Sequence, residues 1–297
     1  IVDGTGASAF YGDVAVEAGK IVQVGGICAA GKREINANGA LLTPGWVDVH
    51  THYDGQATWD PYLSPSSWHG VTTAIMGNCG VGFAPVKPHM REWLIQLMEG
   101  VEDIPNAALT EGMKWQWETF PEYLDALEKM PRAIDIGAQI PHGALRAYVM
   151  GERGIDQVDA SDSEVEAMRE IVESALRAGA FGFSTSRTLI HKGADGVHVP
   201  GTFARVQEVM GIGRALGAAK RGVFQMTSNH VGMDEEAKWM RELARETGQP
   251  VALNLQQIDT HPELWRTLLT ALEDAGAENV PLYGAFCGRP VGLLFSW

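Results

Sequence analysis

The sequence has few cysteines and no long apolar run, and both absences narrow the class of protein. Its three cysteines, Cys28, Cys79 and Cys287, are an odd number at wide spacings, so they predict no disulfide framework. A reducing compartment follows, and we expect a cytoplasmic protein. No stretch approaches the roughly 18 consecutive apolar residues that a membrane-spanning helix needs, so no membrane span is expected.

Basic residues are also scarce relative to acidic ones. Lys and Arg together number 23 against 37 Asp and Glu, which gives a formal net charge of −14 at pH 7. A strongly negative protein is repelled by the phosphates of nucleic acids and of anionic membranes. We therefore expect neither a nucleic-acid nor a membrane partner.

The residues that are present describe an ordinary globular protein with a regular rhythm. The chain has 297 residues, 45% of them hydrophobic, so it can bury the core of one large α/β barrel or of two smaller domains. From residue 44 onward, short apolar runs alternate with amphipathic stretches of helical spacing. Strands are expected at 46–49, 71–76, 134–140, 180–183, 223–226, 251–255 and 280–285, and helices at 90–98, 121–129, 164–178, 206–220, 233–247 and 264–274.

This alternation predicts a parallel α/β fold, a (β/α)8 barrel of the TIM type with about seven units present. The chain ends at Trp297 in an apolar run where an eighth unit would begin, so we expect a fragment truncated before strand eight. The unclosed edges of such a sheet predict self-association. A doubly wound open sheet is the alternative, but no Gly-x-Gly-x-x-Gly follows an early strand, and Gly77–Gly80 does not match that spacing.

Residues 1–43 follow a different pattern. Two short apolar runs, Asp13–Val16 and Gly19–Val24, flank a turn at Ala18–Lys20 and predict a hairpin of a small sheet. Leu41 and Leu42 add another short apolar piece. We therefore expect two domains, 1–43 and 44–297, with the larger one carrying the chemistry.

The segment TPGWVDVHTHYDG, Thr43–Gly55, contains the clearest chemical signal. Its apolar strand runs directly into His50 and His52, and side chains two apart on a strand point to the same face. Two imidazoles on one face can bind a divalent metal ion. The alternative is a pair of polar residues where a strand leaves the sheet, but the apolar strand and the acid Asp54 that follows favour the metal.

Other candidate residues lie where the expected strands end, which is where barrel enzymes hold their active sites. Cys79 follows the second strand and is either a zinc ligand or a small, inert residue in a glycine-rich turn, and the residues alone favour the inert one; a nucleophilic role has no local support. His142 follows the third strand and is either a substrate-facing group or the first residue of a helix. His191 and His198 flank a flexible loop that could close over a ligand.

Four motifs together resemble the amidohydrolase superfamily, and within it the N-acyl-D-amino-acid deacylases, or D-aminoacylases. The motifs are TPGWVDVHTHYDG at 43–55, GVTTAIMGNCGVGFAP at 70–85, PHGALRAYVMG at 141–151 and GAFGFSTSRT at 179–188. The resemblance implies a metal-dependent barrel with a small β-sandwich built from both chain ends, to which residues 1–43 would contribute. It also implies that His50 and His52 are metal ligands and that Cys79 is the family's cysteine ligand, which reverses the preference for an inert Cys79.

The chain departs from the family at two points. The family's fifth and sixth strands each end in a metal-binding histidine, whereas Gln225 and Asn254 stand near those ends here, with His230 several residues further on. The family's catalytic aspartate would lie beyond Trp297. Either His230 or a neighbour such as His142 replaces the missing ligands, or the site is weaker, or a divergent branch handles other substrates.

The resemblance therefore implies a zinc-type hydrolase of C–N amide bonds with one or two divalent ions and an N-acyl-D-amino acid or similar small amide as substrate. The expected metal ligands are His50, His52 and Cys79, with His230 as a further candidate, and the expected substrate-binding residues are His142, Ser184, Arg187 and His191. A cyclic-amide hydrolase of the dihydroorotase or hydantoinase type is one alternative. A catalytically incompetent fragment or binding protein is the other, and we expect the 297-residue chain alone to be inactive.

Overall fold

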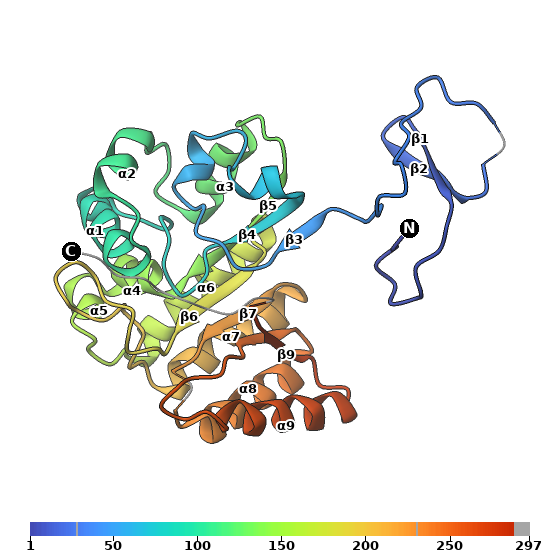
Figure 1. The fold of residues 1–297 in the computed structure, drawn as a ribbon. Helices are drawn as coiled ribbons and strands as arrows, with labels where there is room; N and C mark the ends of the chain where they lie inside the picture. The colour runs from blue at the N-terminus through green and yellow to red at the C-terminus, as the bar shows by residue number, and fades with distance from the viewer. Residues whose placement is uncertain (28, 230, 288–297) are drawn as a thin grey trace.

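The computed structural model describes residues 1–27, 29–229 and 231–287, and its main feature is a curled sheet of seven parallel strands (Figure 1). Each strand pairs with the next one in the chain, from β3 through β9, with a helix in most connections. The strands are β3 (Trp46–Asp48), β4 (Val71–Met76), β5 (Asp135–Pro141), β6 (Gly182–Ser186), β7 (Val223–Thr227), β8 (Val251–Asn254) and β9 (Leu282–Ala285). The prediction of a TIM-type α/β fold with seven units is confirmed.

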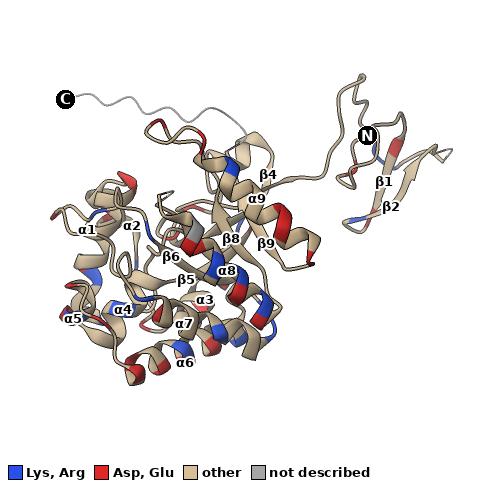
Figure 2. Ribbon diagram, turned by 90° about the horizontal axis from the view of Figure 1, so that it is seen from below, with Lys and Arg blue, Asp and Glu red and all other residues tan. Residues whose placement is uncertain are grey.

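Nine α-helices are found within the described ranges, and the larger ones pack against the sheet. They are α1 (Arg91–Glu102), α2 (Asn106–Gly112), α3 (Phe120–Glu128), α4 (His142–Met150), α5 (Glu152–Ile155), α6 (Asp162–Ala178), α7 (Val206–Ala219), α8 (Met233–Thr247) and α9 (Leu264–Ala277). Fully buried side chains such as Phe183 on β6, Phe224 on β7 and Met240 on α8 form the core between sheet and helices. Figure 2 shows acidic and basic residues interspersed along the helices around the sheet.

The start of α6 shows how local sequence sets the bounds of an element. The Ser161 hydroxyl accepts a hydrogen bond from the backbone N–H of Glu164, and the Glu164 carboxylate accepts one from the backbone N–H of Ser161. This reciprocal cap satisfies two backbone donors that a helix start otherwise leaves unpaired. Of the two serines considered as caps, Ser161 is the one used.

Strand β6 lies two residues later than expected, at Gly182–Ser186 instead of 180–183. The sequence Ser184-Thr185-Ser186 is polar, so hydrophobicity alone places it outside the strand. All three side chains are nevertheless buried, because their hydroxyls find hydrogen-bond partners inside the protein. Alternation along the strand sends Ser184 and Ser186 to one face and Thr185 to the other.

The N-terminal segment forms the expected hairpin. Strands β1 (Asp13–Glu17) and β2 (Lys20–Gly25) pair antiparallel, and Figure 1 shows them apart from the seven-stranded sheet, joined to it by an extended segment. The short apolar piece at Leu41 and Leu42 lies outside any strand, and both leucines are exposed. Among residues 1–27 and 29–43 no third strand pairs with the hairpin, so this piece has no hydrogen-bonding neighbour.

No helix in the described part of the chain is both long enough and apolar enough to cross a membrane.

Candidate metal centre

Three predicted metal ligands converge at the end of β3 and β4. The Nε2 atom of His50 lies 3.1 Å from Sγ of Cys79, and the rings of His50 and His52 are 5.5 Å apart, centre to centre. One ligand atom from each of the three side chains falls within 4.8 Å of the others. Two imidazole nitrogens and a sulfur at this spacing are a donor set that zinc prefers.

A tight turn after β4 delivers Cys79 to this position. Gly77 has φ of +78°, and a Cβ added there would stand 2.1 Å from the carbonyl oxygen of Gln139 on β5. The backbone can therefore pass only if residue 77 is glycine. Cys79 itself takes a left-handed φ of +58°, which turns its thiol toward the two histidines.

Side chains from distant strands hold this turn in place. The backbone N–H of Cys79 donates to Oε1 of Gln225 at 3.2 Å, and the N–H of Gly80 donates to the Ser184 hydroxyl at 3.1 Å. The Ser184 hydroxyl in turn donates to the carbonyl of Gly77. Ser184 was expected to contact substrate, but in the structure it is fully buried and ties β6 to the turn that carries Cys79.

Burial determines the charge of the ligands. It lowers the pKa of His50, and it lowers the pKa of His52 well below its usual value, with His50 and His191 acting in the same direction. Both imidazoles are therefore neutral at pH 7 and can offer a lone pair. Burial also raises the pKa of the Cys79 thiol, and the negative charge of Glu102 raises it further, whereas the Thr227 hydroxyl, 3.2 Å from Sγ, opposes the rise.

Two carboxylates share this buried region. Oε1 of Glu102, the last residue of α1, lies 3.2 Å from Nε2 of His52. Burial, with the charges of Asp54 and Asp103 adding to it, raises the pKa of Glu102 to about 8. Burial likewise raises the pKa of Asp54 to about 7, despite hydrogen bonds from backbone amides. Without a cation, the negative forms of these groups are poorly accommodated.

The unsatisfied atoms at this centre test whether a metal ion fits. Within the described ranges, Nδ1 of His52, Oδ2 of Asp54 and Oε1 of Glu102 are buried without a hydrogen-bond partner. Buried polar atoms normally find partners, so their clustering around a possible ligand set needs an explanation. A divalent cation would satisfy nitrogen, sulfur and oxygen donors together, and the residues present therefore fit a metal.

The other residues expected to bind substrate fall into two groups. His191 joins the centre: one of its ring nitrogens lies within 4.8 Å of ligand atoms of Cys79 and Glu102. Arg187 does not, because its guanidinium donates to the backbone carbonyls of Thr202 and Ala204 and lies 3.3 Å from Glu236 on α8. The fourth ligand candidate, His230, lies outside the described residues.

His142 is placed as the first residue of α4, which was one of its two interpretations. Its Nδ1 lies 2.8 Å from the Thr185 hydroxyl, and its Nε2 lies 2.9 Å from Oε1 of Glu208 on α7. Glu208 also accepts two hydrogen bonds from Arg146, at 2.7 and 2.9 Å. With both ring nitrogens engaged and the side chain fully buried, His142 is not accessible to a substrate in this structure.

Glu102 was not among the residues singled out in the sequence. It lies in the insertion after β4, 23 residues beyond Cys79, at the end of a helix that carries two other acids, Glu92 and Glu99. No local motif distinguishes it from those neighbours. The sequence offers only an indirect indication that Glu102 reaches the site. It is an acid at the end of a helix, in an insertion that must fold back over the sheet.

Comparisons with known proteins show which family and which relatives the chain resembles. Residues 33–294 match the model of the amidohydrolase family. The chain is 28% identical over 292 residues to a D-aminoacylase of Alcaligenes xylosoxydans xylosoxydans, which covers 97% of this chain and 54% of that protein. It is 36% identical over 186 residues to an N-acyl-D-aspartate deacylase of the same organism, which covers 62% of this chain and 34% of that protein.

One similar solved structure is a D-aminoacylase that was determined to establish the functional role of its binuclear metal centre. It superposes on this chain with a TM-score of 0.76 at 26% identity. The match covers 97% of this chain and 56% of that one. The chain thus spans about half the length of the relatives that it matches along nearly all of its own length.

Proposed function

The chain belongs to the amidohydrolase family, and from that premise we propose that it provides the metal-binding part of an enzyme that hydrolyses the amide bond of N-acyl-D-amino acids. The observation that carries the proposal is the convergence of His50, His52 and Cys79 within 4.8 Å. Similarity to a D-aminoacylase along 97% of the chain supports the substrate class.

A divalent cation, with zinc as the best fit, would polarise the amide carbonyl and acidify a water molecule when bound to His50, His52 and Cys79. The chain's own residues prepare that position. The two neutral imidazoles present lone pairs, and the Thr227 hydroxyl donates to the Cys79 sulfur, which makes the thiolate easier to hold in a buried place. The Gln225 amide fixes the backbone of Cys79 and so fixes where its sulfur lies.

Residues around the loop after β6 shape the side from which a substrate enters. Arg187 holds this loop through the carbonyls of Thr202 and Ala204, and its contact with Glu236 ties it to α8. We assign Arg187 and Ser184 positioning roles, because Nη1 of Arg187 and the Ser184 hydroxyl are already hydrogen-bonded within the protein. His142 supports the fold behind the sheet.

Release of free amine from N-acyl-D- and N-acyl-L-amino acids tests the proposal, with the product of the complete gene as the enzyme. We expect turnover of D-configured substrates that a chelator abolishes and added zinc restores. His50→Ala and Cys79→Ala should lower kcat at least a hundredfold, since each removes a metal ligand. His89→Ala, which changes an exposed histidine outside the cluster, is the matched control and should keep wild-type activity.

A metal-loaded protein that releases no amine from any substrate of this panel would overturn the proposed reaction. That outcome would favour the non-catalytic alternative, a binding protein built on the same fold. Chelator-resistant turnover would instead contradict the metal dependence.

A further inference from the structure

A second cluster of possible metal ligands shares Cys79 with the first. One ligand atom each from Cys79, Glu102 and His191 lies within 4.8 Å of the others. These residues come from three separate elements: the turn after β4, the end of α1 and the loop after β6. The cluster contains a thiol, a carboxylate and an imidazole, which are the three side-chain types that bind zinc.

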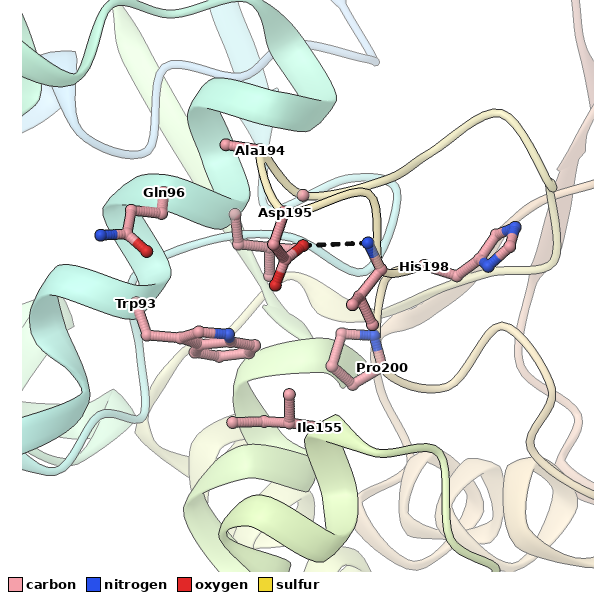
Figure 3. A pocket seen from close by; sticks show the side chains of 10 residues that line it. Trp93, Gln96, Ile155, Ala194, Asp195, His198 and Pro200 are labelled. Atoms are coloured by element: carbon pink, nitrogen blue, oxygen red, sulfur yellow. Dashed lines mark hydrogen bonds between the residues drawn. The ribbon is translucent and has the colours of Figure 1, made fainter.

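A direct contact between α1 and the loop brings Glu102 and His191 together. A Cβ added at Gly100 on α1 would stand 2.2 Å from the backbone nitrogen of Ala194 and 2.3 Å from the backbone of Gly193. The helix and the loop therefore touch through their main chains, two residues from Glu102 and two from His191. Figure 3 shows the same loop beside Trp93 and Gln96 of α1, with Ile155 of α5 lining the same pocket.

Hydrogen bonds around His191 and Glu102 leave one ligand atom of each unused. Nδ1 of His191 lies 3.4 Å from the Ser186 hydroxyl, and this contact can hold the ring with its Nδ1–H toward Ser186 and its Nε2 lone pair free. Oε1 of Glu102 is buried, lies 3.2 Å from Nε2 of His52 and makes no hydrogen bond to any described residue. Both atoms are what a cation position requires.

The residues near the ends of β7 and β8 do not compete for this role. Oε1 of Gln225 accepts the N–H of Cys79, and its Nε2 donates to Thr227 at 3.3 Å and to Asn254 at 3.4 Å. Both ends of the Gln225 amide are thus occupied in holding neighbouring groups. An additional ligand must come from another element, and α1 and the loop after β6 provide two.

We propose that Cys79, Glu102 and His191 would hold a second divalent cation beside the one that His50 and His52 would hold. The inference rests on the proposed function, because it extends the same metal centre. Within the part of the chain that the structure describes, Glu102 and His191 take the places of ligands that β7 and β8 do not supply. Thiolate, carboxylate and imidazole together also bring two negative charges to the two cations.

Metal analysis and zinc titration of the purified, chelator-treated protein test the proposal. Wild-type protein should bind two equivalents of zinc. Glu102→Ala and His191→Ala should each retain the first equivalent and lose the second, with at least a tenfold weaker second dissociation constant. Gly100→Ala should weaken the second equivalent in the same way, because the added methyl group pushes the loop away from α1.

Two matched variants control for general disturbance of these elements. Glu92→Gln lies on α1 and His198→Ala in the same loop, both outside the cluster, and both should bind two equivalents. The proposal is overturned if wild-type protein binds a single equivalent, or if Glu102→Ala and His191→Ala retain both. A wild-type protein that binds no cation at all would overturn the proposed function as well. A single bound equivalent would overturn only the second cation position, so the two failures are distinguishable.

Discussion

Cys79 shows at the scale of one residue why a motif and its geometry are different kinds of information. The four motifs suggest that it is a ligand, but its left-handed φ of +58° and its contact with His50 depend on a turn held by strands β6 and β7. A cysteine with φ above zero is uncommon and adds strain. The surrounding hydrogen bonds hold the turn in this conformation, and the thiol therefore points toward the two imidazoles.

The cluster of His142, Arg146 and Glu208 makes a prediction about pH and stability. Burial raises the pKa of Glu208, but the hydrogen bond and charge of His142 and the guanidinium of Arg146 outweigh burial and leave the pKa below its ordinary value. Burial lowers the pKa of His142, which favours its neutral form. Arg146 is therefore the permanently charged partner of Glu208, and we attribute the lowered pKa of Glu208 to the charge of Arg146. A carboxylate with a lowered pKa stabilises the fold above its unfolded pKa of about 4.3.

Glu208→Gln should therefore reduce the free energy of unfolding by about 3–5 kcal/mol at pH 7, because it leaves the buried Arg146 charge without its partner. The difference between variant and wild type should shrink as the pH falls below about 4.3, since wild-type Glu208 then becomes neutral too. Urea unfolding at a series of pH values measures this difference in the free energy of unfolding. A difference that is constant down to pH ~3 would contradict the charge-pair explanation.

At the scale of elements, the alternation of strands and helices could be predicted from the sequence. The bounds of individual elements were less predictable. Helix α8 begins and ends where its apolar spacing predicts, because Gly248 in a left-handed conformation ends it. Helix α4 was not among the expected helix ranges, although a helix start at His142 was one alternative, since its residues from His142 onward are almost all buried and show no polar face. Strand β6 was shifted because its buried residues are serine and threonine, whose burial depends on partners from other elements.

The turn after β4 makes a prediction at this scale. Gly77→Ala should destabilise the fold by about 3 kcal/mol or more and reduce zinc binding, because the added Cβ meets the Gln139 carbonyl in addition to the strain of a positive φ. Gly248→Ala is the matched control, since Gly248 has φ of +66° and nothing within 4 Å of the added Cβ. Gly248→Ala should reduce the free energy of unfolding by about 1 kcal/mol and leave zinc binding unchanged. Equal effects of the two substitutions would show that the close approach at residue 77 is unimportant.

The candidate site shows the same division between motif and tertiary contact. His50, His52 and Cys79 were predictable because each follows a strand within a distinctive motif. Glu102 was not, because its helix reaches the site only through the contact of Gly100 with Gly193 and Ala194. His142 and Ser184 sit in motifs as well, yet tertiary hydrogen bonds assign them to support the fold.

At the scale of the whole molecule, the sheet has two strands with one neighbour each. Within the described residues, β3 pairs with β4 alone and β9 with β8 alone. Large apolar side chains are exposed at both ends, including Trp46 and Val47 on β3 and Tyr283 on β9. Exposed strand edges with apolar side chains favour pairing with another chain.

The 297-residue chain should therefore self-associate in a concentration-dependent manner. Val47→Lys and Tyr283→Lys together should shift light-scattering mass toward the monomer, because charged residues disfavour edge pairing. Leu189→Lys and Val158→Lys together, at exposed positions outside helices and strands, change the net charge equally without touching the sheet edges and should leave association unchanged. A monodisperse wild-type monomer across the concentration range would refute the prediction.

The most direct test of the central claim is the zinc content per chain of the purified protein, measured by elemental analysis for wild type, His50→Ala and Cys79→Ala. If His50, His52 and Cys79 hold a cation, wild-type protein carries at least one equivalent, and both variants lose most of it while His89→Ala keeps it. Unchanged metal content in both His50→Ala and Cys79→Ala would contradict the account.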